Sequence, residues 1–406
     1  MSGFFRKIKA REAYHPTLTY PAFVCRVSLM RKRYKAVVAR IRAKSGRVVV
    51  AFLTAGPSKW KCQSIYAEMV HTPVFEPWVV CDSGDKDFYV RRGCANVVCS
   101  LDEVNADAVI YQDPWAESSE RNPVWEVSRS ALCLYVPYSI ESIRDSRRSE
   151  RFDYHHLANF HSLMFACFQW SPDYAAHYKA AQFPWEFAGK VLGFGHPTLD
   201  AFVDGRSFDD GLVIYAPHFS FPGGIDAGIT DIGTFNWSGR AVLDYAKGHP
   251  EIKWAFKPHP KLKARLVENG HMTQDDADRY YSDWERIGVA CYDGDYADLF
   301  MRSRAMITDS NSFLLEYMAT GRPLIHLIPK ECKMVPCPQA QKVFDTFYRV
   351  KDESEMRQTF KLVLEDGRDP RRDDRVAASR EACVLGNHAG KRIVDWLAMQ
   401  CGRGEC

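Results

Sequence analysis

Residues 305–317 place an apolar run, four small polar residues and a helix-like pattern directly after one another. The apolar run, 305–308, predicts a buried parallel strand, and the later apolar residues recur at helical spacing. A strand that ends in a polar turn before a helix aims backbone N–H groups and the helix dipole at one spot, which suits a phosphate. The hydroxyls of Ser310 and Ser312 could add donors. The alternative is that Asp309 or Ser310 only caps the helix.

Short apolar runs and helical segments alternate along most of the chain, which predicts an α/β protein with parallel sheets. No GxGxxG motif follows the first predicted strand, so an NAD-type fingerprint is absent. The expected strands cover residues 48–53, 77–80, 96–99, 108–111, 131–136, 164–169, 212–216, 253–256, 289–292, 305–308 and 324–327. The expected helices cover residues 61–69, 238–247, 295–302, 313–320 and 380–399, with 365–380 as a mobile or solvated connection.

The length and one change of composition predict two domains. A chain of 406 residues is long for one hydrophobic core. Near residue 190, a predicted strand ends in two glycines and a proline, which marks a connection. We expect a basic segment over 1–47, a Rossmann-like acceptor domain over 48–190, a Rossmann-like nucleotide-donor domain over 191–380, and a C-terminal helix over 381–406 that could pack on the first domain. Ligands of such sheets bind outside the C-terminal ends of the strands, so the two domains should face each other across a cleft.

Residues 1–47 are rich in lysine and arginine, and Glu12 is their single acidic residue. Apolar residues such as Phe4, Phe5 and Val37 lie among the cations. A segment of this kind can lie on an anionic membrane surface. It can equally be a basic helix that packs on the first domain by one face.

Charge and hydropathy restrict the class of protein. The formal net charge is +3 and 46% of residues are hydrophobic, which gives no indication of nucleic-acid binding. No run reaches the roughly 18 apolar residues of a membrane span, and the N-terminus lacks the apolar core of a signal peptide. We therefore expect a cytoplasmic protein, peripheral at the inner face of the membrane if the basic segment binds lipid. The 13 cysteines are scattered and are typical of reduced core residues. Their spacing disfavours zinc, and we expect no metal and no cofactor.

Two histidines follow predicted strands of the second half. Lys257-Pro258-His259-Pro260 lies at a strand exit, where the prolines fix the backbone, and its Lys257 and His259 could neutralise a diphosphate leaving group. His218, after the strand at 212–216, could contact phosphate or accept a proton. Glu316, one helical turn past Ser312, could accept hydrogen bonds from a ribose or substrate hydroxyl. Each of these side chains could instead be structural.

The first half offers candidates for a general base, which an acceptor alcohol needs. Asp113 ends one predicted strand, and His155 and His156 lie in a polar stretch further on. Tyr138 ends another strand. Ser–His–Asp spacing, HExxH and the P-loop are all missing, which disfavours proteases, zincins and kinases.

Together these segments resemble the CDP-glycerol glycerophosphotransferase family, the teichoic-acid and capsule polymer enzymes with a GT-B fold. The resemblance covers roughly residues 105–350. It is carried by residues 109–115, 135–138, 195–200, 214–218, 256–260 and 307–312, with Glu316. It implies a GT-B-like fold of two Rossmann-like domains and a nucleotide-diphosphate donor as substrate. The implied donor site comprises Lys257, Thr308, Asp309, Ser310, Asn311, Ser312 and Glu316, with His259, His218 and Asp113 as catalytic residues and Tyr138, His155 and His156 on the acceptor side.

One motif departs from this family pattern. Better-known members carry a His-Gly motif in the first domain, whereas this chain has residues 135–138, Tyr-Val-Pro-Tyr. The rest of the resemblance implies a transferase. It would move glycerol phosphate, another polyol phosphate or a sugar to a hydroxyl of a glycan or polyol-phosphate polymer at the cell surface. The alternatives are a nucleotide-sugar epimerase on the same fold and a non-catalytic glycan-assembly protein.

Overall fold

A computed structural model describes residues 20–114, 121–146, 158–181, 187–202, 210–224, 232–290, 296–382 and 388–403. The chain forms two compact units, which are described separately. Unit 1 comprises residues 1–140, 148–201 and 387–406, and unit 2 comprises residues 141–147 and 202–386. Candidate residues His155 and His156 lie outside the described part of the chain.

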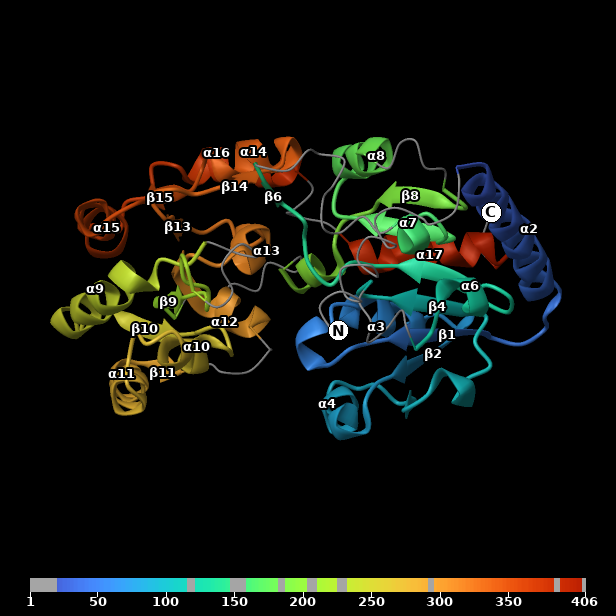
Figure 1. The fold of residues 1–406 in the computed structure, drawn as a ribbon, viewed down its shortest axis with the longest axis horizontal. Helices are drawn as coiled ribbons and strands as arrows, with labels where there is room; N and C mark the ends of the chain where they lie inside the picture. Colours follow the sequence, from blue (N-terminus) through green and yellow to red (C-terminus); the bar gives the residue numbers. More distant parts are fainter. Residues whose placement is uncertain are drawn as a thin grey trace. The chain divides into compact units, whose positions relative to one another are not determined.

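A seven-stranded parallel sheet forms the centre of unit 1 (Figure 1). Its order is β3-β2-β1-β4-β5-β7-β8, so the chain builds outward from β1 in one direction and then from β4 in the other. Strands β1, β4, β5 and β7 are almost entirely buried, as parallel strands covered on both faces must be. The strands are β1 (Val48–Leu53), β2 (Phe75–Val80), β3 (Val97–Val98), β4 (Ala108–Tyr111), β5 (Leu132–Tyr135), β7 (Ala166–Gln169) and β8 (Lys190–Gly193).

Helices from both ends of the chain pack on this sheet. One face of α2 (Tyr20–Ala43) buries Phe23, Val27, Met30 and Ile41 in the core of unit 1. At the other end, α17 (Ala389–Gln400) packs against α3 (Gln63–His71) (Figure 1). The remaining helices are α4 (Lys86–Arg91), α6 (Val124–Val127), α7 (Ala158–His161) and α8 (Pro172–Ala181), with 3₁₀ turns η1 (Pro57–Lys59), η2 (Ser83–Asp85), η3 (Leu101–Glu103) and η5 (Pro197–Phe202).

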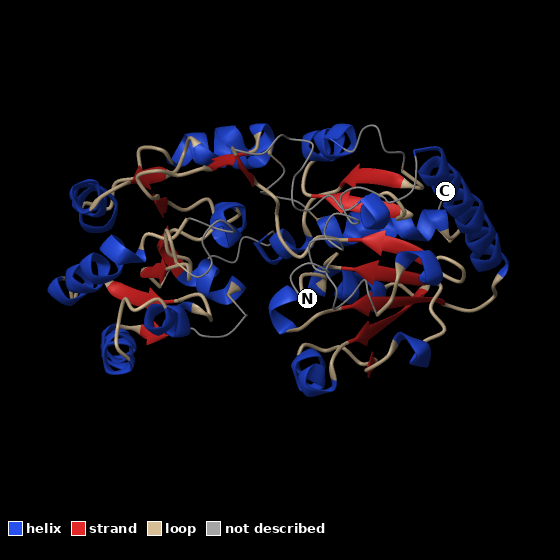
Figure 2. Cartoon of the chain, in the orientation of Figure 1, coloured by secondary structure: helices blue, strands red, loops and turns tan. Residues whose placement is uncertain are grey.

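A six-stranded parallel sheet, in the order β11-β10-β9-β12-β13-β15, forms the centre of unit 2 (Figure 2). The two central strands, β9 and β12, are almost entirely buried, and the sequence of β9 is a continuous apolar run. The strands are β9 (Leu212–Ala216), β10 (Lys253–Phe256), β11 (Val289–Ala290), β12 (Ser303–Thr308), β13 (Leu324–Leu327) and β15 (Tyr348–Val350). A separate antiparallel pair joins β6 (Ile143–Asp145) to β14 (Met334–Pro336), so residues 141–147 belong to unit 2.

The helices of unit 2 bury an aromatic core that includes Phe235, Tyr280, Trp254 and Trp284. Helix α9 contacts both α11 and α15. The helices are α9 (Phe235–Gly248), α10 (Leu262–Glu268), α11 (Gln274–Ile287), α12 (Ala297–Arg302), α13 (Leu314–Met318), α14 (Gln341–Phe344), α15 (Glu353–Phe360) and α16 (Arg372–Glu381), with turns η6 (Asn311–Phe313) and η7 (Pro338–Ala340) and a π-helical turn η8 (Lys361–Glu365).

Two expectations for the C-terminal region are wrong. Residues 365–380 were expected to be a solvated connection, but α16 occupies most of that range. The reason is tertiary, since the side chain of Arg375 is buried, pairs with Asp369 and donates to the carbonyl of Gly321. The expected helix over 380–399 is likewise shorter, because α17 begins at Ala389.

In the described residues, no helix is both long and apolar enough to cross a membrane.

Candidate functional site

The predicted site residues of unit 2 lie at the ends of β9, β10 and β12. Successive strands are added on one side of β9 and then, from β12 on, on its other side. Strand β9 lies between β10 and β12, and the pairs Ala216–Thr308 and Tyr215–Phe256 are in register. The segments that begin at Pro217, Lys257 and Asp309 therefore leave the sheet at the same edge. In open parallel sheets this reversal point at the C-terminal strand ends is where ligands bind.

The carboxylate of Asp309 ties these segments together. Its Oδ1 accepts from the amide of His218 at 2.6 Å, and its Oδ2 accepts from the amide and the hydroxyl of Thr234 at 2.6 and 3.0 Å. Burial raises the pKa of Asp309, while these donors act in the opposite direction. With 1% exposure and three donors, the Asp309 carboxylate orients the loop after β9 and the start of α9.

The Asp309 carboxylate does not serve as a cap for its own following helix. Instead, its partners lie 91 and 75 residues away in sequence, in the loop after β9 and at the start of α9. The hydrogen bonds therefore make it a positioning residue for the candidate site.

His218 and His259 lie side by side, with ring centroids 5.3 Å apart. The Nδ1 of His218 lies 3.2 Å from the amide of Ser220 and 2.9 Å from its hydroxyl, and the Nδ1 of His259 accepts from the amide of Lys261 at 3.1 Å. A neutral imidazole whose Nδ1 accepts carries its proton on Nε2. Both rings can therefore offer an Nε2–H donor.

Burial and nearby positive charge keep both imidazoles neutral. Burial, followed by repulsion from His259 when that ring is protonated, lowers the pKa of His218 to about 3. Burial, followed by the charges of Lys261 and Lys257, lowers the pKa of His259 to about 4. A neutral Nε2–H tautomer donates a hydrogen bond and cannot take a proton at that nitrogen, so the geometry favours the phosphate-contact role of His218 over the proton-acceptor role.

Lys257 adds a cation next to the turn after β12. Its Nζ lies 5.7 Å from the ring centroid of Tyr296 and 5.8 Å from that of Phe313, and its side chain is buried. The hydroxyl of Tyr296 also donates to the carboxylate of Glu316. The structure thus brings Lys257 and Glu316 together through one tyrosine that the sequence analysis did not identify.

The turn at 310–312 differs from the expectation of bare helix amides. The Ser310 amide donates to the Thr308 hydroxyl at 2.9 Å, and the Ser312 amide donates to the Ser310 hydroxyl at 3.4 Å. The turn continues as a single 3₁₀ turn and the short helix α13. Neighbouring hydroxyls therefore already accept from the amides of both serines, and the Ser310 hydroxyl caps the 3₁₀ turn, as the capping alternative expects.

In unit 1, the candidates Asp113 and Tyr138 gather around Lys59. The Lys59 Nζ lies 3.7 Å from Asp113 Oδ2 and 5.6 Å from the ring centroid of Tyr138. Asp113 is fully buried at the end of β4, and Lys59 lies in the loop after the adjacent strand β1. The strand order of the first sheet reverses between β1 and β4, as that of the second sheet does between β9 and β12. Asp113 and Lys59 therefore occupy the corresponding position in unit 1.

Part of the resembling sequence has a structural role. Within residues 195–200, the His196 Nε2 contacts the Pro137 carbonyl at 2.8 Å, and the carboxylate of Asp200 accepts from the amides of Ala389 and Gly390 at 2.8 and 2.7 Å. Asp200 therefore holds the start of α17 in unit 1.

Several arginines of α2 bind unit 1 itself. Arg31 donates to the carbonyl of Phe187 at 2.7 Å, and Arg33 donates to that of Trp125 at 2.7 Å. These contacts, with the buried apolar face of α2, correspond to the interpretation of a basic helix packed by one face. Residues 1–19 lie outside the described part of the chain.

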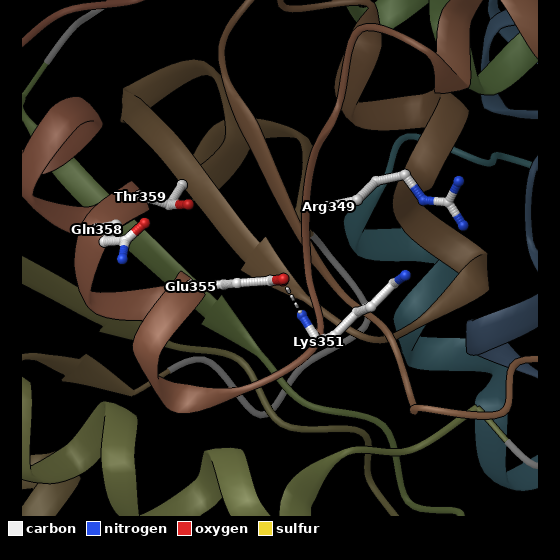
Figure 3. Close-up of a pocket in the computed structure, with 5 residues that line it drawn as sticks. All are labelled: Arg349, Lys351, Glu355, Gln358 and Thr359. Carbon is white, nitrogen blue, oxygen red and sulfur yellow. Dashed lines mark hydrogen bonds between the residues drawn. The ribbon is translucent and has the colours of Figure 1, made fainter.

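Two hollows lie near the ends of β13 and β15. One is open, and Figure 3 shows its lining residues Arg349, Lys351, Glu355, Gln358 and Thr359, with Arg349 and Lys351 extending away from Gln358 and Thr359. The other includes Asn311, His326 and Arg349 in its lining. Asn311 is the predicted site residue that connects this second hollow to the turn after β12. As for metals, the described residues contain no group of three or more His, Cys, Asp or Glu side chains that could hold an ion.

Some residues of this arrangement were not predicted from the sequence. Thr234, Tyr296 and Phe219 all contact predicted site residues, and Phe219 lies 4.3 Å from the His259 ring centroid. For Phe219 the signal was its position next to His218. Thr234 and Tyr296 have no comparable signal, since only folding brings them to the site.

Comparison with solved structures identifies the fold class. The chain has a GT-B-like α/β fold with two Rossmann-like domains. No protein-family model matches the sequence, and neither does any curated protein.

The similar structures include two kinds of enzyme. A putative UDP-N-acetylglucosamine 2-epimerase from Listeria monocytogenes is 11% identical over 89% of this chain and 98% of that chain, with a TM-score of 0.61. The UDP-GlcNAc 2-epimerase from Neisseria meningitidis bound to UDP-GlcNAc is 11% identical over 87% and 100%, with a TM-score of 0.55. The wall teichoic acid polymerase TagF is 13% identical over 94% and 96%, with a TM-score of 0.53. At such low sequence identities, the similarity to these structures shows the fold alone.

Proposed function

We propose that the protein is an enzyme that binds a nucleotide-diphosphate donor at the C-terminal ends of β9, β10 and β12. The observation that carries the proposal is the pair of neutral histidines, His218 and His259, whose Nδ1 atoms are occupied and whose Nε2–H groups are donors. With the ammonium of Lys257, they form a donor set suited to a diphosphate. The similar structures support this, since one is bound to UDP-GlcNAc.

The proposed reaction is group transfer. An acceptor hydroxyl attacks the activated group, which is glycerol phosphate, another polyol phosphate or a sugar, and the bond to the nucleotide breaks. The leaving nucleotide gains negative charge on its phosphate oxygen. Preorganised donors such as His259 Nε2–H and the Lys257 ammonium stabilise charge that develops in the transition state. Asp113 is our candidate for the group that takes the proton of the hydroxyl, and Glu316 for the group that accepts from the ribose.

A cell-surface glycan or polyol-phosphate polymer is the proposed acceptor, as the sequence resemblance implies. We also propose that the basic N-terminal region can contact an anionic membrane surface at the inner face of the membrane. Lys32 and Lys35 are exposed on α2 and support this. Co-sedimentation of the full chain with phosphatidylserine vesicles tests this proposal. Equal vesicle binding by the wild type and the double variant Lys32→Glu/Lys35→Glu would contradict a membrane contact through α2.

The second candidate function is epimerisation of a nucleotide sugar. It is favoured by the similarity to the putative UDP-N-acetylglucosamine 2-epimerase from Listeria monocytogenes, which extends over 98% of that chain. An epimerase needs no acceptor, so release of an epimerised sugar from donor alone would identify it. A non-catalytic assembly protein would bind nucleotide and turn over no donor.

The test is turnover of CDP-glycerol, CDP-ribitol, UDP-glucose and UDP-GlcNAc, with and without acceptor, by wild type and His259→Ala. We expect the variant to lose about 10²–10³-fold in rate, the usual cost of one transition-state donor. The matched control is His249→Ala, which removes a histidine of the same unit that contacts the Tyr245 carbonyl instead. Full activity in His259→Ala would remove this residue from the mechanism.

A further inference from the structure

The loop after β9 carries one aromatic side chain that touches both histidines of the proposed diphosphate site. The ring centroid of Phe219 lies 4.3 Å from that of His218 and 4.3 Å from that of His259. The ammonium of Lys261 lies 5.5 Å from the same ring centroid. Phe219 is half-buried and packs against the core of unit 2. A single side chain therefore contacts two imidazoles and one cation.

The backbone on both sides of Phe219 is fixed. The amide of His218 donates to the carboxylate of Asp309 at 2.6 Å, and the amide of Gly233 donates to the hydroxyl of Ser220 at 3.2 Å. A Cβ added at Gly233 would lie 1.8 Å from the carbonyl oxygen of Ser220, so the two backbone segments pack directly against each other. Because its flanking residues are held in this way, the ring of Phe219 is a fixed surface for its neighbours.

The imidazole of His259 needs such a surface. Its Nδ1 accepts from the amide of Lys261 at 3.1 Å, and its backbone amide donates to the carbonyl of Pro217 at 3.0 Å. The second bond fixes the backbone and leaves the side chain free to rotate. The ring is also only half-buried, so its rotamer depends on the single bond at Nδ1 and on packing against Phe219.

An aromatic side chain at position 219 suits both neighbours of His259. Its face packs against an imidazole, and it attracts the Lys261 ammonium, which an aliphatic side chain does not. Burial, followed by the charges of Lys261 and Lys257, lowers the pKa of His259 to about 4. Phe219 contributes to the burial by covering the imidazole, and to the charge effect by keeping Lys261 nearby. Both effects favour the neutral ring that offers an Nε2–H donor.

We propose that Phe219 is a positioning residue for His259, whose imidazole it holds in the rotamer in which Nδ1 accepts from Lys261 and Nε2 carries the proton. The consequence for catalysis rests on the proposed function. The effect on the imidazole does not, since it is a property of the protein without any ligand.

Heteronuclear NMR of the full chain with isotope-labelled histidine tests this role, because the shifts of Nδ1 and Nε2 report the tautomer and the protonation of each ring. The His259 signal is assigned by its loss in His259→Gln. In the wild type we expect a neutral Nε2–H ring down to about pH 5.5. In Phe219→Leu we expect a mixture of the two neutral tautomers and a midpoint of protonation at least about one pH unit higher, toward the ordinary value. Phe219→Tyr keeps the ring and should keep the wild-type signal.

Phe221→Leu is the matched control. Phe221 lies on the same loop, and its ring stacks on a different histidine, His271, at a centroid distance of 4.2 Å. This variant should leave the His259 signal unchanged. An unchanged His259 signal in Phe219→Leu, or an equal change in Phe219→Leu and Phe221→Leu, would overturn the positioning role.

Turnover of CDP-glycerol, CDP-ribitol, UDP-glucose and UDP-GlcNAc measures the catalytic consequence. We expect Phe219→Leu to lower kcat at least about tenfold with a smaller change in KM, because one transition-state donor is misplaced and not removed. Wild-type kcat in Phe219→Leu with an altered His259 signal would overturn the consequence for catalysis. Absence of nucleotide binding and of turnover by the wild type would overturn the proposed function, whereas the NMR comparison would still decide whether Phe219 positions His259.

Discussion

The carboxylate of Asp309 accepts a 2.6 Å hydrogen bond from the backbone amide of His218, which is 91 residues away in sequence. This bond joins the ends of β12 and β9, and a second one joins β12 to the start of α9 through Thr234. Since His259 lies against His218, the loop that Asp309 holds carries one member of this imidazole pair. The site is thus organised by Asp309, although the ligand would contact other side chains.

Replacing Asp309 with Asn should disturb this arrangement. An amide has one acceptor oxygen where three donors now bind, so at least one buried donor loses its partner, at about 1–3 kcal/mol. We expect a lower free energy of unfolding in urea and weaker nucleotide binding by calorimetry. Asp298→Asn, on the exposed side of α12, is the control and should change neither. Unchanged nucleotide affinity in a folded Asp309→Asn protein would contradict the positioning role.

Replacing Tyr296 with Phe should lower both the stability of the protein and its affinity for nucleotide. The change keeps the ring near Lys257 and removes the hydroxyl that donates to buried Glu316. A hydrogen bond to a charged group contributes about 1.5–3 kcal/mol. We expect a loss of stability together with a nucleotide affinity that falls by about tenfold, since Glu316 loses its orientation.

The control for Tyr296 is Tyr245→Phe. That variant also removes a tyrosine hydroxyl that donates to a glutamate, Glu365, in the same unit. It should lose stability and keep the nucleotide affinity of the wild type. Equal nucleotide affinities in the two variants would show that Tyr296 does not contribute to nucleotide binding.

Acid should destabilise the protein through its buried histidines. The pKa of His196 is lowered to about 4, and those of His218 and His326 to about 3, chiefly by burial. The unfolded state binds protons near pH 6.5 while the folded state does not, so this stability is present above pH 6.5 and is lost as pH falls. Each histidine should contribute about 2 kcal/mol to the difference between pH 7 and pH 5.

Urea midpoints at pH 7 and pH 5 measure this effect. The raised pKa of Asp309 acts in the opposite direction, above the ordinary carboxyl value near 3.8. His326→Phe should reduce the pH dependence, because it removes one of the titrating groups. A midpoint that is constant between the two pH values would show that these histidines titrate normally.

Removing the Asp200 carboxylate should loosen the C-terminal helix. Asp200→Ala leaves the amides of Ala389 and Gly390 without their acceptor, which typically costs about 1–2 kcal/mol for a helix N-terminus. We expect faster hydrogen exchange in α17 and a lower unfolding midpoint. Asp395→Ala, on the same helix, removes only an exposed pair with Lys391 and should have little effect. Equal exchange rates in the two variants would contradict the capping role.

Much of the fold could be predicted because the buried parallel strands are mostly apolar. The bounds of β9, β10 and β13 are confirmed to the residue. By contrast, α16 was not predicted because its sequence is polar, and its buried Arg375 pairs with Asp369 and donates to the distant Gly321 carbonyl. The β6–β14 pair joins residues nearly 200 positions apart and leaves no local pattern.

The site shows the same division between local and distant information. His218, Lys257 and His259 could be predicted because each follows a strand end, a local feature. How their loops are tied together could not be predicted, since Asp309 accepts hydrogen bonds from the amides of His218 and Thr234, which are distant in sequence. The amides of Ser310 and Ser312 were predicted to face a phosphate. Instead, they donate to hydroxyls two residues earlier in the chain, and these hydroxyls would compete with a ligand for the same amides.

The most direct measurement is a crystal structure of the protein with bound CDP or UDP. We predict that the diphosphate lies within hydrogen-bond distance of the Nε2 atoms of His218 and His259, with the Lys257 ammonium beside it. A nucleotide bound away from the ends of β9, β10 and β12, or with its phosphates turned from both imidazoles, would contradict the account.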